Sequence, residues 1–250
     1  MMIKITQACS MGCSHCMNNT TPHGEHMDFG TFMNVIDFQK KYGGPICFIT
    51  GGEPFEHPEF WRFIWYAMSE LPMTLITIAT NGVAMADPKN TKLILQACEE
   101  KHLISFQVST DSRYYPTRID TSLPVYHLKN VTLITKIPKI YPQGRAKTNN
   151  LDWQAIGSKC FNVRAITKQL PNPSLSDIVI ALFAHNRICT PHIDIYGGIK
   201  LGESDLCPTC SSIYKRDEEI VQDILSFKCS KCKHVNANLR KEMRTLIGED

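Results

Sequence analysis

Cys9-Ser10-Met11-Gly12-Cys13-Ser14-His15-Cys16 directly follows a short apolar run near the start of this 250-residue sequence, and Gly51-Gly52-Glu53-Pro54 directly follows a second one. Both segments therefore stand where a predicted strand ends and a loop begins. Short apolar runs alternate with amphipathic helical patterns as far as residue 136. This alternation indicates parallel βαβ units, which close into a partial barrel or form an open sheet.

The predicted helices and strands follow from the spacing of apolar residues. Asp28 can cap the N-terminus of a helix in which Phe32, Met33 and Ile36 share one face. The third predicted strand is apolar enough to be buried on both faces of the sheet. Further helices are predicted over residues 57–70 and from residue 87 onward, and strands over residues 3–6, 45–50, 73–80, 104–109 and 131–137.

Cysteine content points to a metal centre. The sequence has 11 cysteines and a net charge of +3, and it has neither a signal peptide nor a run of about 18 apolar residues. We therefore expect a cytoplasmic protein with no membrane partner. In a reducing compartment, clustered cysteines indicate metal binding or catalysis rather than disulfides.

The thiolates of Cys9, Cys13 and Cys16 are natural ligands of an iron–sulfur cluster. Three cysteines can hold three irons of a cubane and leave the fourth iron without a protein ligand, as a reactive metal site requires. Zinc is the alternative, and it would need a fourth ligand, which His15, His23 or His26 could supply.

Polar residues follow the next three predicted strands. The glycines Gly51 and Gly52 allow the backbone to approach a ligand, and Glu53 offers a carboxylate to a cation. Ligands of α/β sheets bind at the carboxyl ends of strands. Ribose contacts are therefore predicted for the residues that follow the third and fourth strands, with plain turns as the alternative: Asn81, Ser109 and Asp111.

The cysteine triad and the GGEP segment together resemble the radical SAM family, whose pattern is C-x3-C-x2-C after the first strand and a GGE-type motif after the second. The resemblance covers roughly residues 2–136 and implies a partial (β/α)6 TIM-like barrel. It implies that S-adenosylmethionine (SAM) binds the open iron of a [4Fe–4S] cluster while GGEP contacts the SAM amino group. One electron then cleaves SAM, and the 5′-deoxyadenosyl radical abstracts hydrogen from a substrate.

Two positions refine the resemblance. Gly144-Arg145-Ala146 resembles a GRA segment of radical SAM proteins with extra clusters, so Arg145 is a candidate for pairing with the SAM carboxylate; a surface arginine is the alternative. The residue before the last triad cysteine is often aromatic in this family and is His15 here.

The chain is predicted to divide into a radical SAM domain over residues 1–150 and a cysteine-rich metal-binding extension over residues 151–250. Cys189-x12-Gly202-x4-Cys207 resembles the opening of the SPASM/twitch extensions, and residues 192–207 read as a β-hairpin with its turn at Gly197-Gly198. A shortened extension would hold a second [4Fe–4S] cluster, and its predicted ligands are Cys189, Cys207, Cys229 and Cys232.

Zinc is again the alternative, because Cys207-x2-Cys210-x18-Cys229-x2-Cys232 fits a four-cysteine zinc site.

The resemblance favours a peptide substrate, as in peptide or natural-product maturation, and a reductant protein such as flavodoxin or ferredoxin. The first cluster cysteine is residue 9, so a leader-binding domain would have to come from another protein. Radical-based RNA or nucleotide modification with a zinc knuckle is the less favoured alternative, on the basic stretch over residues 228–244. A non-catalytic binding protein has no use for an open cluster.

Overall fold

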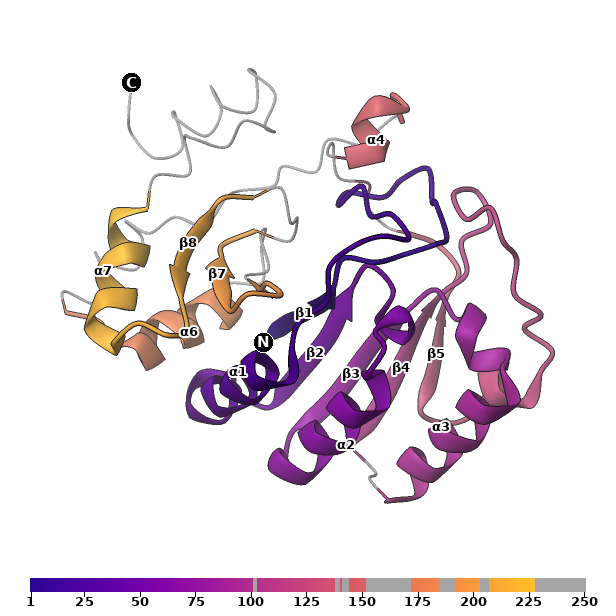
Figure 1. Cartoon of the computed structure of the whole chain (residues 1–250), viewed down its shortest axis with the longest axis horizontal. Coiled ribbons are helices and arrows are strands. Elements are labelled where there is room, and N and C mark those ends of the chain that lie inside the picture. The colour runs from indigo at the N-terminus through magenta and orange to yellow at the C-terminus, as the bar shows by residue number, and fades with distance from the viewer. Residues whose placement is uncertain are drawn as a thin grey trace.

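The computed structural model of the chain describes residues 1–100, 103–137, 140, 144–151, 172–184, 192–202 and 207–227. These residues contain an eight-stranded sheet in the order β5-β4-β3-β2-β1-β6-β7-β8 (Figure 1). The first six strands run parallel, and β7 pairs antiparallel with both β6 and β8. The strands are β1 (Met2–Thr6), β2 (Ile46–Gly51), β3 (Leu75–Thr80), β4 (Ile104–Ser109), β5 (Val131–Ile134), β6 (His192–Ile193), β7 (Gly198–Lys200) and β8 (Thr209–Ser212).

The long helices cover one face of this sheet (Figure 1). Between the strands lie three short 3-10 helices, η1 (Pro54–Glu56), η2 (Val83–Ala86) and η3 (Pro124–His127). The α-helices are α1 (Phe29–Tyr42), α2 (Phe60–Glu70), α3 (Pro88–Glu100), α4 (Gly144–Thr148), α6 (Leu175–Ala184) and α7 (Asp217–Ser226). The mostly parallel α/β architecture confirms the predicted partial TIM-like fold.

The two faces of the sheet differ in chemistry. Ile3, Ile76 and Ile78 are fully buried in the core beneath α1 and α2. Because side chains alternate along a strand, the neighbouring polar side chains point to the opposite face. There Thr77 and Ser105 share a hydrogen bond of 3.0 Å across β3 and β4. The face away from the helices is therefore partly polar, unlike the apolar face that packs on them.

Helix α1 begins where the sequence predicts. The Asp28 carboxylate accepts a hydrogen bond of 2.9 Å from the Thr31 amide, which caps the helix. Phe32 and Ile36 are fully buried as expected. Met33, predicted on the same face, is 39% exposed. One residue advances a helix by about 100°, so Met33 lies beside the buried stripe rather than on it.

The bounds of β1, β2 and β3 differ from prediction by one or two residues, and two larger differences have a clear cause. Helix α2 begins at Phe60 rather than at residue 57, because His57 ends the 3-10 turn η1 and its Nδ1 accepts the Glu59 amide at 3.0 Å. Strand β5 ends at Ile134 rather than at residue 137. The Ile137 amide donates to the Asp111 carboxylate at 2.8 Å and so leaves the ladder with β4.

The predicted hairpin at Gly197-Gly198 is confirmed, because β6 and β7 pair antiparallel across it. Gly197 has φ +79, and the Gly198 amide donates to the Asp194 carboxylate at 2.8 Å. This hairpin continues the sheet of β1–β5, and the predicted domain boundary at residue 150 stays a prediction.

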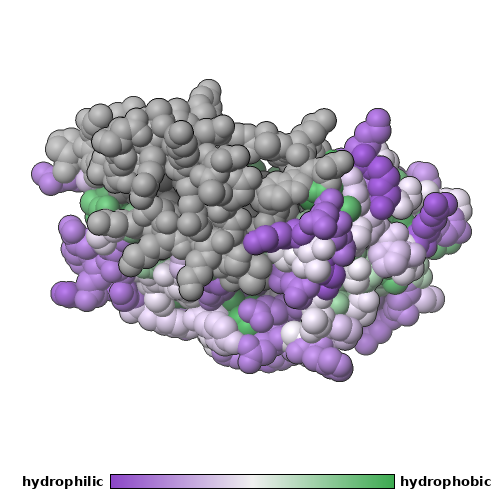
Figure 2. Space-filling view, turned by 90° about the horizontal axis from the view of Figure 1, so that it is seen from above, coloured by the Kyte–Doolittle hydropathy of each residue, from purple (hydrophilic) through white to green (hydrophobic). Residues whose placement is uncertain are grey.

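The surface is mostly hydrophilic where the described residues face the top of the molecule, with apolar colour confined to small patches (Figure 2). Among the described helices, none has the length and apolar character that crossing a membrane demands.

Candidate active site at the ends of the first strands

The cysteine loop, residues 7–20, leaves the end of β1 and lies directly over the end of β2. The Gly52 amide donates to the Thr6 carbonyl at 2.7 Å, and the Glu53 amide donates to the Ala8 carbonyl at 2.8 Å. A Cβ atom on Gly51 would lie 2.3 Å from the Thr6 oxygen, and one on Gly52 would lie 2.1 Å from the Ala8 oxygen. The two glycines are therefore what lets the GGEP segment reach the cysteine loop.

Cys9, Cys13 and Cys16 gather in one small cluster. Cys9 and Cys13 are buried at 8% exposure each, Cys16 is half-buried, and Met11 and Tyr115 pack against them. The Cys16 sulfur lies 3.5 Å from the Thr20 hydroxyl. The structure thus brings together the three thiols that the sequence singled out.

The three thiols differ in how readily they ionise. Burial raises the pKa of Cys9, and burial together with the charges of Cys9 and Cys16 raises the pKa of Cys13 to about 12. Burial opposes ionisation of Cys16 too, but hydrogen bonds from Thr20 and Asn18 and the Arg145 charge bring its pKa below the ordinary thiol value. A metal that binds here must therefore displace protons from at least two thiols.

The donor set is that of a cluster with three protein ligands. In a cubane each iron takes its own thiolate, so the thiols stand around the cluster rather than around one atom. Three thiols in an apolar niche, two of them buried and one half-buried, offer one thiolate to each of three irons. Within the described part of the chain, no three His, Cys, Asp or Glu side chains are arranged to hold one metal ion.

Glu53, which follows the two glycines, is buried at 2% exposure. It accepts hydrogen bonds from the Thr80 hydroxyl at 2.8 Å, the Asn81 amide at 2.7 Å and the Phe55 amide at 3.2 Å. Burial outweighs these contacts and raises the pKa of Glu53 to about 7. The charge of Glu53 contributes to the raised pKa of Cys9, so the carboxylate lies near the first thiol of the triad.

Ser109 stands at the end of β4 and forms a hydrogen bond with Tyr115. Burial raises the pKa of Tyr115, and the nearby charges of Cys13 and Glu53 act in the same direction. Tyr115 therefore lies near both the triad and Glu53. Sequence reasoning missed this residue, because nothing marks a tyrosine six positions beyond a strand as part of a site.

His15 takes an aromatic role in packing. Its ring lies 5.1 Å from the rings of both Tyr114 and Tyr115. Burial lowers the pKa of His15 to about 4, so the ring is neutral at physiological pH. This contact explains how a histidine stands where the family often has an aromatic residue.

Asn81 and Asp111 are occupied with neighbouring groups of the chain. The Asn81 side-chain oxygen accepts a hydrogen bond from the Val83 amide at 2.9 Å, and the Asn81 backbone amide donates to the Glu53 carboxylate. The Asp111 carboxylate accepts Arg113 Nε at 2.8 Å and the Ile137 amide at 2.8 Å. Hydrogen bonding to Arg113 holds the pKa of Asp111 well below its usual range. Ribose contacts by these residues and by Ser109 stay a prediction.

Arg145 lies on the outer side of the cysteine loop. Its Nε donates to the Cys13 carbonyl at 3.0 Å, and its Nη1 donates to the Thr20 carbonyl at 2.7 Å. These bonds use two of its five N–H groups. Pairing with a SAM carboxylate by the remaining groups stays a prediction.

A second carboxylate, that of Glu56, binds the cysteine loop. Glu56 accepts both the amide and the hydroxyl of Ser10, at 2.9 Å and 2.8 Å. Glu56 is the last residue of η1 and Glu53 is its N-cap, so one short turn positions both carboxylates.

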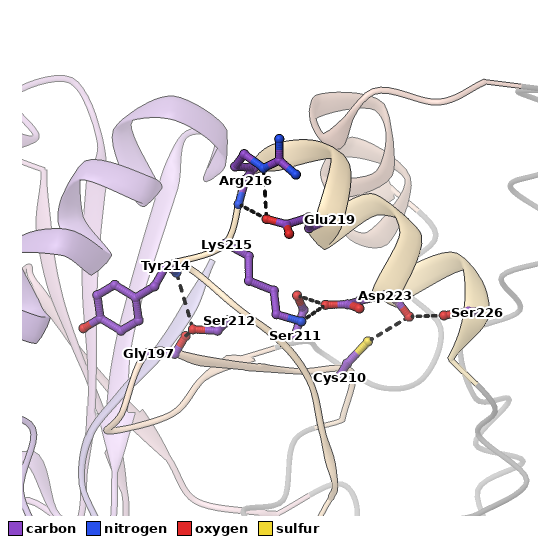
Figure 3. Close-up of polar contacts among 10 residues, drawn as sticks. All are labelled: Gly197, Cys210, Ser211, Ser212, Tyr214, Lys215, Arg216, Glu219, Asp223 and Ser226. Atoms are coloured by element: carbon purple, nitrogen blue, oxygen red, sulfur yellow. Dashed lines mark hydrogen bonds and ion pairs between the residues drawn. The ribbon is translucent and has the colours of Figure 1, made fainter.

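The C-terminal cysteines are only partly described. Cys189, Cys229 and Cys232 lie outside the described residues, whereas Cys207 and Cys210 are half-buried near β8. A Cβ on Gly202 would lie 2.5 Å from the Cys207 sulfur, so the glycine of the predicted pattern lies directly beside that thiol. The Cys210 sulfur points to α7 and donates to the Asp223 carbonyl at 3.6 Å (Figure 3).

Comparisons with known proteins agree with this geometry. The family model described as the Radical SAM superfamily matches residues 3–131. No curated protein sequence matches the chain.

Solved structures share its fold at low sequence identity. BtrN in complex with AdoMet and 2-DOIA has a TM-score of 0.56 and 12% identity, covering 99% of this chain and 86% of BtrN. Streptococcus suis SuiB bound to the precursor peptide SuiA has a TM-score of 0.53 and 14% identity, covering 91% of this chain and 66% of SuiB. Native anSMEcpe with bound AdoMet and Cp18Cys peptide has a TM-score of 0.52 and 12% identity, covering 99% and 82%.

Proposed function

This chain belongs to the radical SAM superfamily, and we propose that it is an enzyme that binds a [4Fe–4S] cluster on Cys9, Cys13 and Cys16 and cleaves SAM there. The observation that supports this most directly is the gathering of the three thiols in one cluster, with the buried Glu53 carboxylate near Cys9 at the end of the adjacent strand. When bound and reduced, the cluster would supply the electron that breaks the C–S bond of SAM to give methionine and a 5′-deoxyadenosyl radical, which abstracts hydrogen from a substrate.

The chain's own residues would bind and orient SAM. Glu53 accepts a hydrogen bond from the SAM amino group, and Gly51 and Gly52 let the backbone lie against the methionine part. Asn81, Ser109 and Asp111 stand along the strand ends where the ribose would lie, and Arg145 is the proposed partner of the SAM carboxylate.

We infer a peptide substrate. Two of the similar structures, SuiB and anSMEcpe, contain peptides in addition to the shared fold. A low-potential protein such as flavodoxin or ferredoxin would deliver the electron. RNA or nucleotide modification is the less favoured alternative, and the basic stretch that suggests it, residues 228–244, lies outside the described residues.

The extension over residues 151–250 would hold a second [4Fe–4S] cluster on Cys189, Cys207, Cys229 and Cys232. A zinc site on Cys207, Cys210, Cys229 and Cys232 is the alternative, and the metal content of the protein distinguishes the two sets.

Spectroscopy of anaerobically reconstituted protein tests the proposed function. Dithionite should produce the electron paramagnetic resonance signal of a reduced [4Fe–4S] cluster, and SAM should change that signal because it binds the open iron. A peptide encoded beside this gene, deuterated at its carbon–hydrogen bonds, should transfer deuterium to 5′-deoxyadenosine. A cluster signal that SAM leaves unchanged would contradict SAM binding, and absence of deuterium transfer would reject that peptide.

A further inference from the structure

Helix α4 lies against the outer side of the cysteine loop, although the two are far apart in sequence (Figure 1). Besides the two carbonyl contacts of the Arg145 guanidinium, the Arg145 amide donates to the Cys16 carbonyl at 2.9 Å. The Asn149 side chain donates to the Ser14 carbonyl at 2.9 Å. One short segment thus binds four backbone carbonyls of the loop, and two of them belong to the triad residues Cys13 and Cys16.

The approach of α4 to the loop depends on Gly144. This residue has φ +53, and an added Cβ would lie 2.6 Å from the Cys16 oxygen and 2.7 Å from the Met17 oxygen. A side chain here is excluded both by backbone conformation and by contact with the loop. Gly144 and Arg145 therefore serve one purpose, which is to seat α4 on the cysteine loop.

We propose that Arg145 is a positioning residue for the cluster: its guanidinium bridges the Cys13 and Thr20 carbonyls, fixes the cysteine loop before metal binds, and places a permanent positive charge beside the cluster. This proposal rests on the proposed function and adds to it a role for α4. Arginine suits the task because its rigid planar fork donates to two acceptors at once. A nearby cation also favours the more negative, reduced cluster, so it raises the reduction potential.

Hydrogen exchange of the metal-free, reduced chain tests whether Arg145 fixes the cysteine loop in the absence of a cluster. In Arg145→Gln, amides of residues 9–20 should exchange at least about tenfold faster than in wild type, because charged hydrogen bonds to the loop are lost. Amides of α1 serve as the internal reference in each sample. Lys147→Gln is the matched control, since it removes an exposed positive charge from the same helix and should leave loop exchange unchanged.

The reduction potential of the cluster distinguishes an electrostatic effect of Arg145 from a purely structural one. In reconstituted protein, Arg145→Gln should lower the cluster potential and Lys147→Gln should change it less, because solvent screens the exposed lysine. Arg145→Lys keeps the charge but loses the two-pronged contact. Its potential should therefore stay close to that of wild type while its loop exchanges faster.

Each result decides part of the proposal. If the loop amides of Arg145→Gln exchange no faster than those of Lys147→Gln, Arg145 does not fix the cysteine loop. Equal reduction potentials in the two variants would overturn the electrostatic role. If Arg145→Gln does not fold, Gly144→Ala replaces it. That variant retains every charge and should still speed hydrogen exchange of the loop, because it displaces α4. Unchanged exchange would again show that α4 does not fix the loop. Wild-type protein that assembles no cluster would contradict the proposed function but not the exchange result.

Discussion

Replacing Glu53 by Gln should change how the stability of the metal-free chain depends on pH. Glu53 is 2% exposed, and burial raises its pKa from 4.5 to about 7. The folded chain therefore keeps this proton at pH values where the unfolded chain has released it. Glu53 favours folding at low pH, and this advantage is lost between about pH 4.5 and pH 7, at up to about 1.4 kcal/mol per pH unit and about 3 kcal/mol in all.

Urea unfolding of wild type and Glu53→Gln under reducing conditions measures this effect. The wild-type free energy of unfolding minus that of the variant should fall by about 3 kcal/mol between about pH 4.5 and pH 8. A pH-independent free-energy cost of placing the glutamine amide at position 53 changes the size of this difference but not its slope with pH. Asp28→Asn is a control of opposite sign, because hydrogen bonds from Thr31 lower the pKa of Asp28 and its stabilisation is lost as pH falls. A pH-independent difference for Glu53→Gln would refute the argument that burial governs this carboxyl.

Three further outcomes are expected. Glu53→Ala should weaken SAM binding at least about tenfold in calorimetry, because a charge-assisted hydrogen bond is lost, and unchanged affinity would make GGEP a structural turn only. Asp111→Asn should lower the free energy of unfolding by about 2 kcal/mol in urea, because the contacts to Arg113 and the Ile137 amide weaken; an unchanged value would show that this clamp contributes nothing. Elemental analysis after anaerobic reconstitution should give about eight irons per chain, whereas about four irons and one zinc would support the zinc site.

Local patterns predicted the strand ends that carry the site. Strand β4 has the predicted bounds, and the triad and Glu53 meet because parallel strands place their carboxyl ends at one edge. The apolar spacing of α1 predicts its buried face except at Met33, which lies beside the buried stripe.

Contacts between distant segments could not be predicted in this way. Arg145 contacts Cys13 across 132 positions of the sequence, and Tyr115 packs against the triad from a loop with no periodic pattern. The sequence marked Arg145 as a residue of interest, but only the fold shows that it binds the carbonyls of the cysteine loop. The same limit applies to the C-terminal cysteines, whose spacing alone fits two ligand sets.

Release of 5′-deoxyadenosine tests the central claim most directly. Anaerobically reconstituted wild-type protein, given dithionite and SAM, should release 5′-deoxyadenosine, and Cys13→Ala should not, because one iron of the cluster loses its thiolate. Chromatography with mass detection quantifies the product, and Cys98→Ala serves as a control, since this half-buried thiol lies on α3 away from the triad. Release from wild type and Cys98→Ala but not from Cys13→Ala is the predicted result. Undiminished release from Cys13→Ala, or none from wild type with a full cluster, would contradict the account.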